Sequence, residues 1–135
     1  MDIRIKNYYC LIAGVLAIFF AITHAWSGQS AVLPTLLVND ISLDTRITFT
    51  YVWHIITAEN LIFGIVFIIL SSQSEKPKIR FAAWMIVSLL LIRLMVILSV
   101  TAFYDVSALT NTLIDSFAIL IYAAFIILGT RINKE

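Results

Sequence analysis

The chain has few charged residues for its length. Only 13% of its 135 residues are charged, and 9 Lys and Arg against 8 Asp and Glu leave a net charge of +1. This balance provides no basic surface that could neutralise the phosphates of a nucleic acid. We therefore exclude nucleic-acid binding.

Cysteine, proline and glycine are also scarce. The single Cys10 can form neither an intrachain disulfide nor a cysteine metal cage. Pro34 and Pro77 lie outside the long apolar runs, so the sequence does not predict the broken helices that often form transporter sites. The scattered glycines form no phosphate-cradling loop, and no catalytic order of Ser, His and Asp is present. These absences argue against an enzyme without excluding one.

What remains is strongly apolar. Hydrophobic residues make up 61% of the chain, and the mean hydropathy is +1.01. Backbone groups in hydrocarbon must be satisfied internally, so long apolar runs are predicted to cross the bilayer as helices. Four runs qualify, at about 8–26, 47–70, 81–103 and 108–130. We predict an all-α integral membrane protein of one domain, 1–135, built as an antiparallel four-helix bundle.

The connections between the runs are unequal. Residues 27–46 form a long first connection that contains "AVLPTLLV", an apolar piece interrupted by Pro34. We expect this connection to be an outer loop or lid, with a short interfacial helix as one reading and an ordered loop as the other. Arg4 and Lys6 before the first run are also typical of a signal peptide, but we interpret this run as a retained helix.

Lysine and arginine predict the orientation. Segments rich in these residues stay on the cytoplasmic side, and most of them fall on one side of the predicted bundle. They are Arg4, Lys6, Lys76, Lys78, Arg80, Arg131 and Lys134. We therefore expect both termini to be cytoplasmic and the protein to reside in the plasma (inner) membrane.

Ionisable side chains within the runs are the candidate functional residues. They are His24, His54, Glu59, Arg93 and Asp115. Counted at about 1.5 Å per residue, all lie in the outer half of the membrane or near its midplane. Intramembrane ionisable residues are by default candidates for function, so we predict a polar pocket that opens outward. Its predicted ligand-binding residues are His24, His54, Thr57, Asn60, Arg93, Asn111 and Asp115.

Arg93 needs a partner or water, because an isolated arginine at this depth costs several kcal/mol. Asp115 is one candidate, since the tight connection makes the third and fourth helices neighbours. Glu59 is the other candidate. It lies on nearly the opposite face of its helix from His54, so it could instead meet another subunit.

Several functions fit this pattern. The first is binding or transport of a small solute, ion or lipid-like molecule, by a homo-oligomer because four helices enclose little space. A second is a redox subunit in which His24 and His54 ligate a haem or a transition metal. A third is a non-catalytic accessory subunit or assembly factor of a larger membrane complex. The same polar residues could also serve only as interhelical hydrogen bonds.

Overall fold

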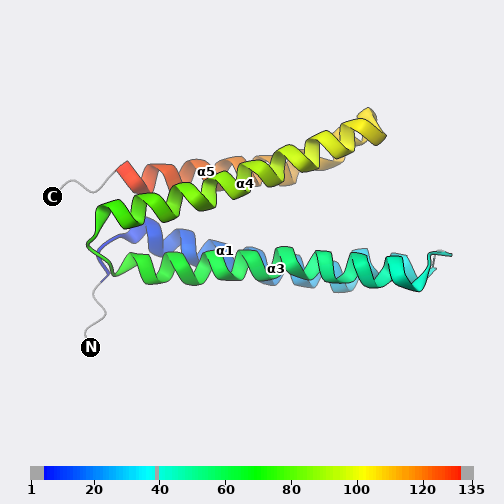
Figure 1. Cartoon of the computed structure of the whole chain (residues 1–135), viewed down its shortest axis with the longest axis horizontal. Coiled ribbons are helices and arrows are strands. Elements are labelled where there is room, and N and C mark those ends of the chain that lie inside the picture. Colours follow the sequence, from blue (N-terminus) through cyan, green and yellow to red (C-terminus); the bar gives the residue numbers. More distant parts are fainter. Residues whose placement is uncertain (1–4, 39, 132–135) are drawn as a thin grey trace. The chain divides into compact units, whose positions relative to one another are not determined.

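The computed structural model describes residues 5–38 and 40–131, which are almost entirely helical (Figure 1). The long helices are α1 (Tyr8–Ser27), α3 (Leu43–Ser71), α4 (Lys76–Tyr104) and α5 (Leu113–Arg131). Three shorter elements are the π-helical turn η1 (Gly28–Val32), α2 (Leu33–Val38) and the 3-10 helix η2 (Val106–Thr112). Within these described residues, four helical stretches are long and apolar enough to cross a membrane. The prediction of an all-α membrane protein with four spans is confirmed.

The chain divides into two compact units. The α1–α3 unit comprises Gly14–Ile69, and the α4–α5 unit comprises Met1–Ala13 together with Leu70–Glu135. Most residues in each span are not buried by the chain itself. Their apolar side chains therefore contact the lipid bilayer.

Two glycines hold the α1–α3 unit together. A Cβ added at Gly14 would lie 2.8 Å from the Gly64 carbonyl oxygen, and one added at Gly64 would lie 2.9 Å from the Gly14 carbonyl oxygen. The backbones of α1 and α3 are thus in direct contact, as small residues allow in membrane helices. Gly28, near the other end of α1, faces Trp53. The pairing of later α1 residues with earlier α3 residues makes the two helices antiparallel.

A stripe of small side chains on α1 is buried, as the 100° helical step predicts. Cys10, Ala13, Ala17 and Ala21 are each at most 5% exposed. Small side chains on one face let the neighbouring segments approach α1 closely.

The first connection, 27–46, was predicted as an outer loop or lid with a short helix as one of two readings. The structure has a short helix there, because α1 continues through η1 into α2, and α3 begins at Leu43. Pro34 sits in the first turn of α2, where its missing N–H and fixed φ are tolerated. The π turn before it is closed by the Leu33 N–H donating to the Gly28 carbonyl. At the start of α3, the Ser42 hydroxyl accepts from the Thr45 N–H at 3.3 Å, as an N-cap does.

The α4–α5 unit is closed at one end by the start of the chain. The Lys6 and Asn7 backbone N–H groups both donate to the Ser71 carbonyl, at 2.8 and 2.9 Å. The Asn7 side chain accepts from the Cys10 N–H at 3.1 Å and donates to the Gly129 carbonyl at 3.5 Å. The backbone bonds therefore tie residues 6 and 7 to Ser71 at the end of α3, and the Asn7 side chain ties them to Gly129 near the end of α5.

A tyrosine continues this attachment. The Tyr122 hydroxyl donates to the Ala13 carbonyl at 2.8 Å. Tyr9 also packs on Phe125, with ring centroids 5.5 Å apart. The start of α1 and the end of α5 therefore run antiparallel.

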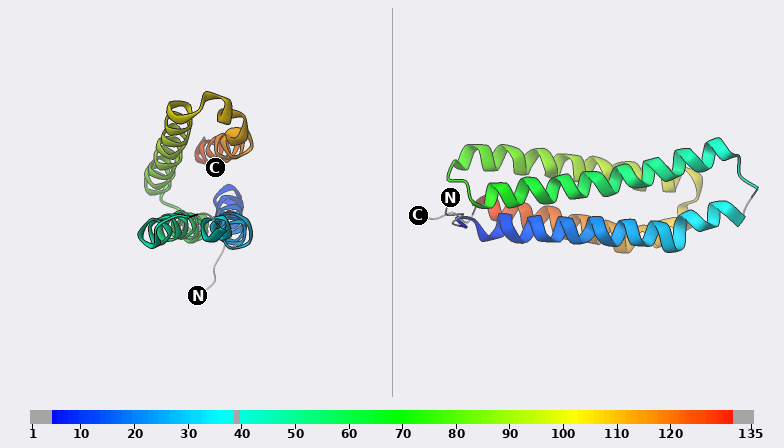
Figure 2. Two further views of the ribbon diagram at one scale, coloured as in Figure 1. Left: turned by 90° about the vertical axis from the view of Figure 1, so that its right-hand side faces the viewer. Right: turned by 90° about the horizontal axis from the view of Figure 1, so that it is seen from below.

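Two further boundaries differ from the predicted runs. Helix α4 begins at Lys76 rather than 81, because Pro77 is favourable in a first helical turn even among charged residues. The fourth span begins with η2, which connects α4 to α5 (Figure 2). Asp105 caps η2 by accepting from the Ser107 N–H at 2.9 Å and from its hydroxyl at 2.7 Å. Chiefly through these bonds, Ser107 lowers the pKa of the Asp105 carboxyl.

Candidate functional site

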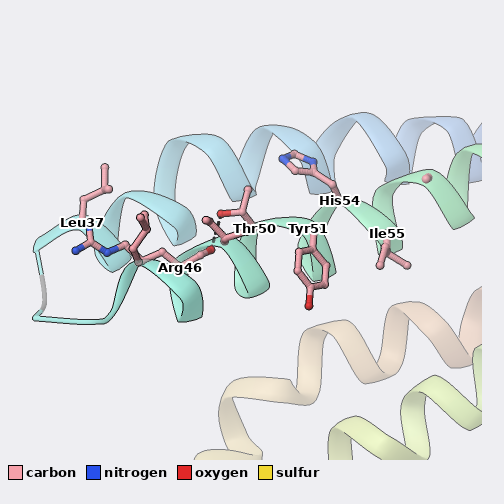
Figure 3. Close-up of a pocket in the computed structure, with 9 residues that line it drawn as sticks. Leu37, Arg46, Thr50, Tyr51, His54 and Ile55 are labelled. Carbon is pink, nitrogen blue, oxygen red and sulfur yellow. Dashed lines mark hydrogen bonds between the residues drawn. The ribbon is translucent and has the colours of Figure 1, made fainter.

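An open groove runs along α3 in the α1–α3 unit, with Leu37 of α2 at one end (Figure 3). Its volume is about 620 Å³, within the usual range of small-molecule sites. The lining is mostly apolar, with three polar side chains among nine residues. These residues are Leu37, Leu43, Arg46, Ile47, Thr50, Tyr51, His54, Ile55 and Ala58.

Helical periodicity arranges the lining of α3 into two adjacent stripes. The polar stripe is Arg46, Thr50 and His54, at intervals of four residues. The apolar stripe, one residue further along, is Ile47, Tyr51, Ile55 and Ala58. Residues at this spacing lie above one another on a helix, and the stripes extend about 18 Å from Arg46 to Ala58. The surface of the groove is nevertheless mainly apolar, and the polar side chains contribute only a small part of it.

Arg46 lies at the end of the groove next to the connection between α2 and α3 (Figure 3). It is half-buried, and its Nε–H donates to the Ile41 carbonyl at 2.9 Å. The Thr50 hydroxyl donates to the Arg46 carbonyl at 2.8 Å, a bond inside the helix. The Arg46 side chain is thus fixed by a carbonyl of the segment that precedes α3.

His54 contributes the imidazole of the groove and points toward α1 (Figure 3). Its Nε2 lies 2.9 Å from the side-chain nitrogen of Gln29 in η1. An amide nitrogen can only donate, so the His54 Nε2 accepts this hydrogen bond. The π turn therefore orients the histidine that lines the groove.

His24 is engaged elsewhere in the same unit. Its ring stacks on the Trp53 indole, with centroids 4.4 Å apart and an interplanar angle of 5°. The indole N–H donates to the His24 carbonyl at 3.0 Å. A Cβ at Gly28 would clash with this indole, so glycine is needed there. His24, predicted to bind a ligand, is thus in contact with Trp53.

The predicted site residues divide between the two units. His24, His54, Thr57, Asn60 and Glu59 lie in the α1–α3 unit. Of the first four, only His54 lines the groove. The Thr57 hydroxyl donates to the Trp53 carbonyl at 3.5 Å, while Glu59 and Asn60 are half-buried on α3.

Arg93, Asn111 and Asp115 lie in the α4–α5 unit. Arg93 is half-buried on α4, Asn111 is exposed in η2, and Asp115 is exposed in the first turn of α5. A carboxylate at that position is stabilised by the helix dipole, whatever else it binds. That Arg93 pairs with Asp115 or Glu59 stays a prediction, as does a pocket that joins all seven predicted residues.

A haem or metal shared by His24 and His54 stays a prediction. In the structure the face of the His24 ring stacks on Trp53, and the His54 Nε2 is hydrogen-bonded to Gln29. Among residues 5–38 and 40–131, no group of three or more His, Cys, Asp or Glu side chains could hold a metal ion.

Comparisons with protein-family models, curated proteins and solved structures found no match to this chain.

Sequence reasoning missed Arg46 and Gln29. Arg46 precedes the predicted apolar run 47–70 and was therefore not among the candidate residues within the runs, and Gln29 fell in the predicted connection 27–46. A signal for Arg46 was nevertheless present, because it lies four and eight residues before Thr50 and His54.

Proposed function

We propose that this protein binds an amphiphilic small molecule in the groove along α3. The observation that carries the proposal is a mainly apolar groove with the half-buried guanidinium of Arg46 at one end. A soluble polar solute would leave the apolar stripe unused, whereas a pure hydrocarbon would leave the terminal amino groups of Arg46 uncompensated. An amphiphile satisfies both the apolar stripe and Arg46.

The dimensions support the same proposal. The lining of α3 extends about 18 Å, which is close to half of the roughly 30 Å hydrocarbon thickness of a bilayer. Arg46 immediately precedes the apolar run of α3, at the level expected for polar headgroups. The apolar stripe then continues into the hydrocarbon. A molecule resident in one leaflet would lie along the groove in this orientation.

The test compares the molecules that co-purify with three forms of the protein in an uncharged detergent. Ala58→Trp fills the inner end of the groove, whereas Ala118→Trp adds the same side chain at an exposed position on α5. Mass spectrometry of extracts is expected to find an enriched amphiphile with the wild type and Ala118→Trp, and to lose it with Ala58→Trp. Equal extracts from all three forms would overturn the proposal.

We further propose that both termini face the cytoplasm of a plasma membrane. In the α4–α5 unit, five exposed basic residues gather at the end that carries the hydrogen bonds to Ser71 and Gly129, as the positive-inside rule requires of a cytoplasmic end. They are Lys6, Lys76, Lys78, Arg80 and Arg131.

Cysteine labelling tests this orientation. In a Cys10→Ala background, a membrane-impermeant maleimide applied to intact cells should label Ser107→Cys and not Ser74→Cys, because these exposed positions flank α4 on opposite sides. Permeabilised cells should label both. The reverse pattern on intact cells would mean the opposite orientation.

A further inference from the structure

The groove carries one permanently charged side chain. Among the nine described residues that line it, Arg46 is the only Lys, Arg, Asp or Glu. We infer that the occupant is an amphiphile with an oxyanion headgroup, a carboxylate or a phosphate, bound by the terminal amino groups of Arg46. This inference rests on the proposed function and specifies the chemistry of its ligand.

The guanidinium of Arg46 is positioned for this role. Its Nε–H is used by the Ile41 carbonyl, which fixes the plane of the group. Within the described part of the chain, the terminal amino groups of Arg46 make no hydrogen bond or ion pair. These groups form a fork that matches the two oxygens of a carboxylate or phosphate. Half-burial strengthens such a bond relative to one in open water.

The other polar groups of the groove serve a headgroup less well. The Thr50 hydroxyl proton is already donated to the Arg46 carbonyl, and the His54 Nε2 accepts from Gln29. His54 also lies two helical turns below Arg46, about 12 Å along the axis, beside the part of the groove that an alkyl chain would occupy. Arg46 is thus the group that would distinguish a charged from an uncharged headgroup.

The nearest acidic side chain on α3 does not neutralise this site. Asp44 precedes Arg46 by two residues, which places it about 200° around the helix. It is exposed and does not line the groove. An anion would therefore approach Arg46 from the groove side, away from this carboxylate.

The experiment varies the headgroup while the chain length is kept constant. Radiolabelled palmitate, hexadecyl phosphate and hexadecanol are titrated onto the full-length protein in phosphatidylcholine nanodiscs at alkaline pH. The wild type is expected to bind the two anions about tenfold more tightly than the alcohol, the ratio expected from one charge-assisted hydrogen-bonded pair. Arg46→Gln should abolish this preference, whereas Arg80→Gln, at an exposed position in the α4–α5 unit, should retain it.

The wild-type comparison needs no variant, so it stays decisive if Arg46→Gln fails to fold. Arg46→Lys, which retains the charge, should keep most of the preference for anions. Equal binding of all three probes by the wild type would overturn the inference and leave the proposed function standing. Loss of affinity for all three in Ala58→Trp is expected, and unchanged binding in that variant would overturn both.

Two sources could supply an oxyanion on an apolar chain. One is a free fatty-acid-like molecule, and the other is an anionic phospholipid of the bilayer. Replacing part of the phosphatidylcholine with phosphatidylglycerol separates them. Suppression of palmitate binding to the wild type would support the inference with a membrane phospholipid as the occupant. Unchanged palmitate binding would support it with a free single-chain anion.

Discussion

The two units of the molecule use polar side chains in different ways. In the α4–α5 unit, the buried Tyr122 and Asn7 side chains bond backbone carbonyls of distant segments. In the α1–α3 unit, the helices meet through glycine backbones, and the polar side chains of Arg46 and His54 line an open groove. The comparison teaches that buried polar side chains join distant segments in one unit, whereas in the other the half-buried Arg46 lies beside an open groove, where the proposed ligand would bind.

The largest loss of stability is expected from a variant that breaks the glycine contact of the α1–α3 unit. Gly14→Leu would place side-chain atoms where the Gly64 carbonyl and Ile68 now lie, 2.8 Å from the added Cβ. We expect a loss of about 3 kcal/mol in the free energy of unfolding, as for overpacked cores. The measurement is unfolding by SDS titration in mixed micelles. Val15→Leu, at a position 55% exposed, should stay within about 0.5 kcal/mol of the wild type.

The second variant tests the junction of α1, η1 and Trp53. Gly28→Ala should displace the indole and break its hydrogen bond to the His24 carbonyl. The expected cost is about 2 kcal/mol, from one lost hydrogen bond and the repacking around it. Ser27→Ala serves as the exposed control. If Gly28→Ala cost as much in a Trp53→Phe background as alone, the indole contact would not be the cause.

A smaller effect is expected from the hydroxyl that joins α5 to α1. Tyr122→Phe removes the bond to the Ala13 carbonyl and keeps the ring, so it should cost about 1 kcal/mol. Tyr104→Phe, at a position 83% exposed, should have no measurable effect. Equal stability of the two variants would mean that the buried hydroxyl contributes nothing to joining the segments.

The smallest effect on stability is expected in the groove. Ile55→Ala truncates a side chain that is 51% exposed and should change the free energy of unfolding by less than about 0.5 kcal/mol. It should nevertheless weaken amphiphile binding, measured with radiolabelled palmitate. Phe67→Ala, at a position 1% exposed, should cost about 3 kcal/mol and provides the contrast. A large loss of stability in Ile55→Ala would place this residue in the core of the unit.

The sequence by itself determined that this is an all-α membrane protein. A long apolar run in hydrocarbon must satisfy its own backbone N–H and C=O groups, and a helix does so within one segment. It also determined the small-residue face of α1, since a 100° step places Ala13, Ala17 and Ala21 on one side. Helix ends were less predictable, since Pro77 and Ser42 begin helices among polar residues, where hydropathy carries no signal.

Only the tertiary structure decided the candidate site. Whether His24 and His54 share a ligand depends on side-chain neighbours, and the structure gives them Trp53 and Gln29 respectively. Residues 28–38 are helical, and this places Leu37 beside Arg46 at one end of the groove. Spacing along one helix can place residues on a common face, but which second helix covers that face follows from packing between segments distant in the sequence.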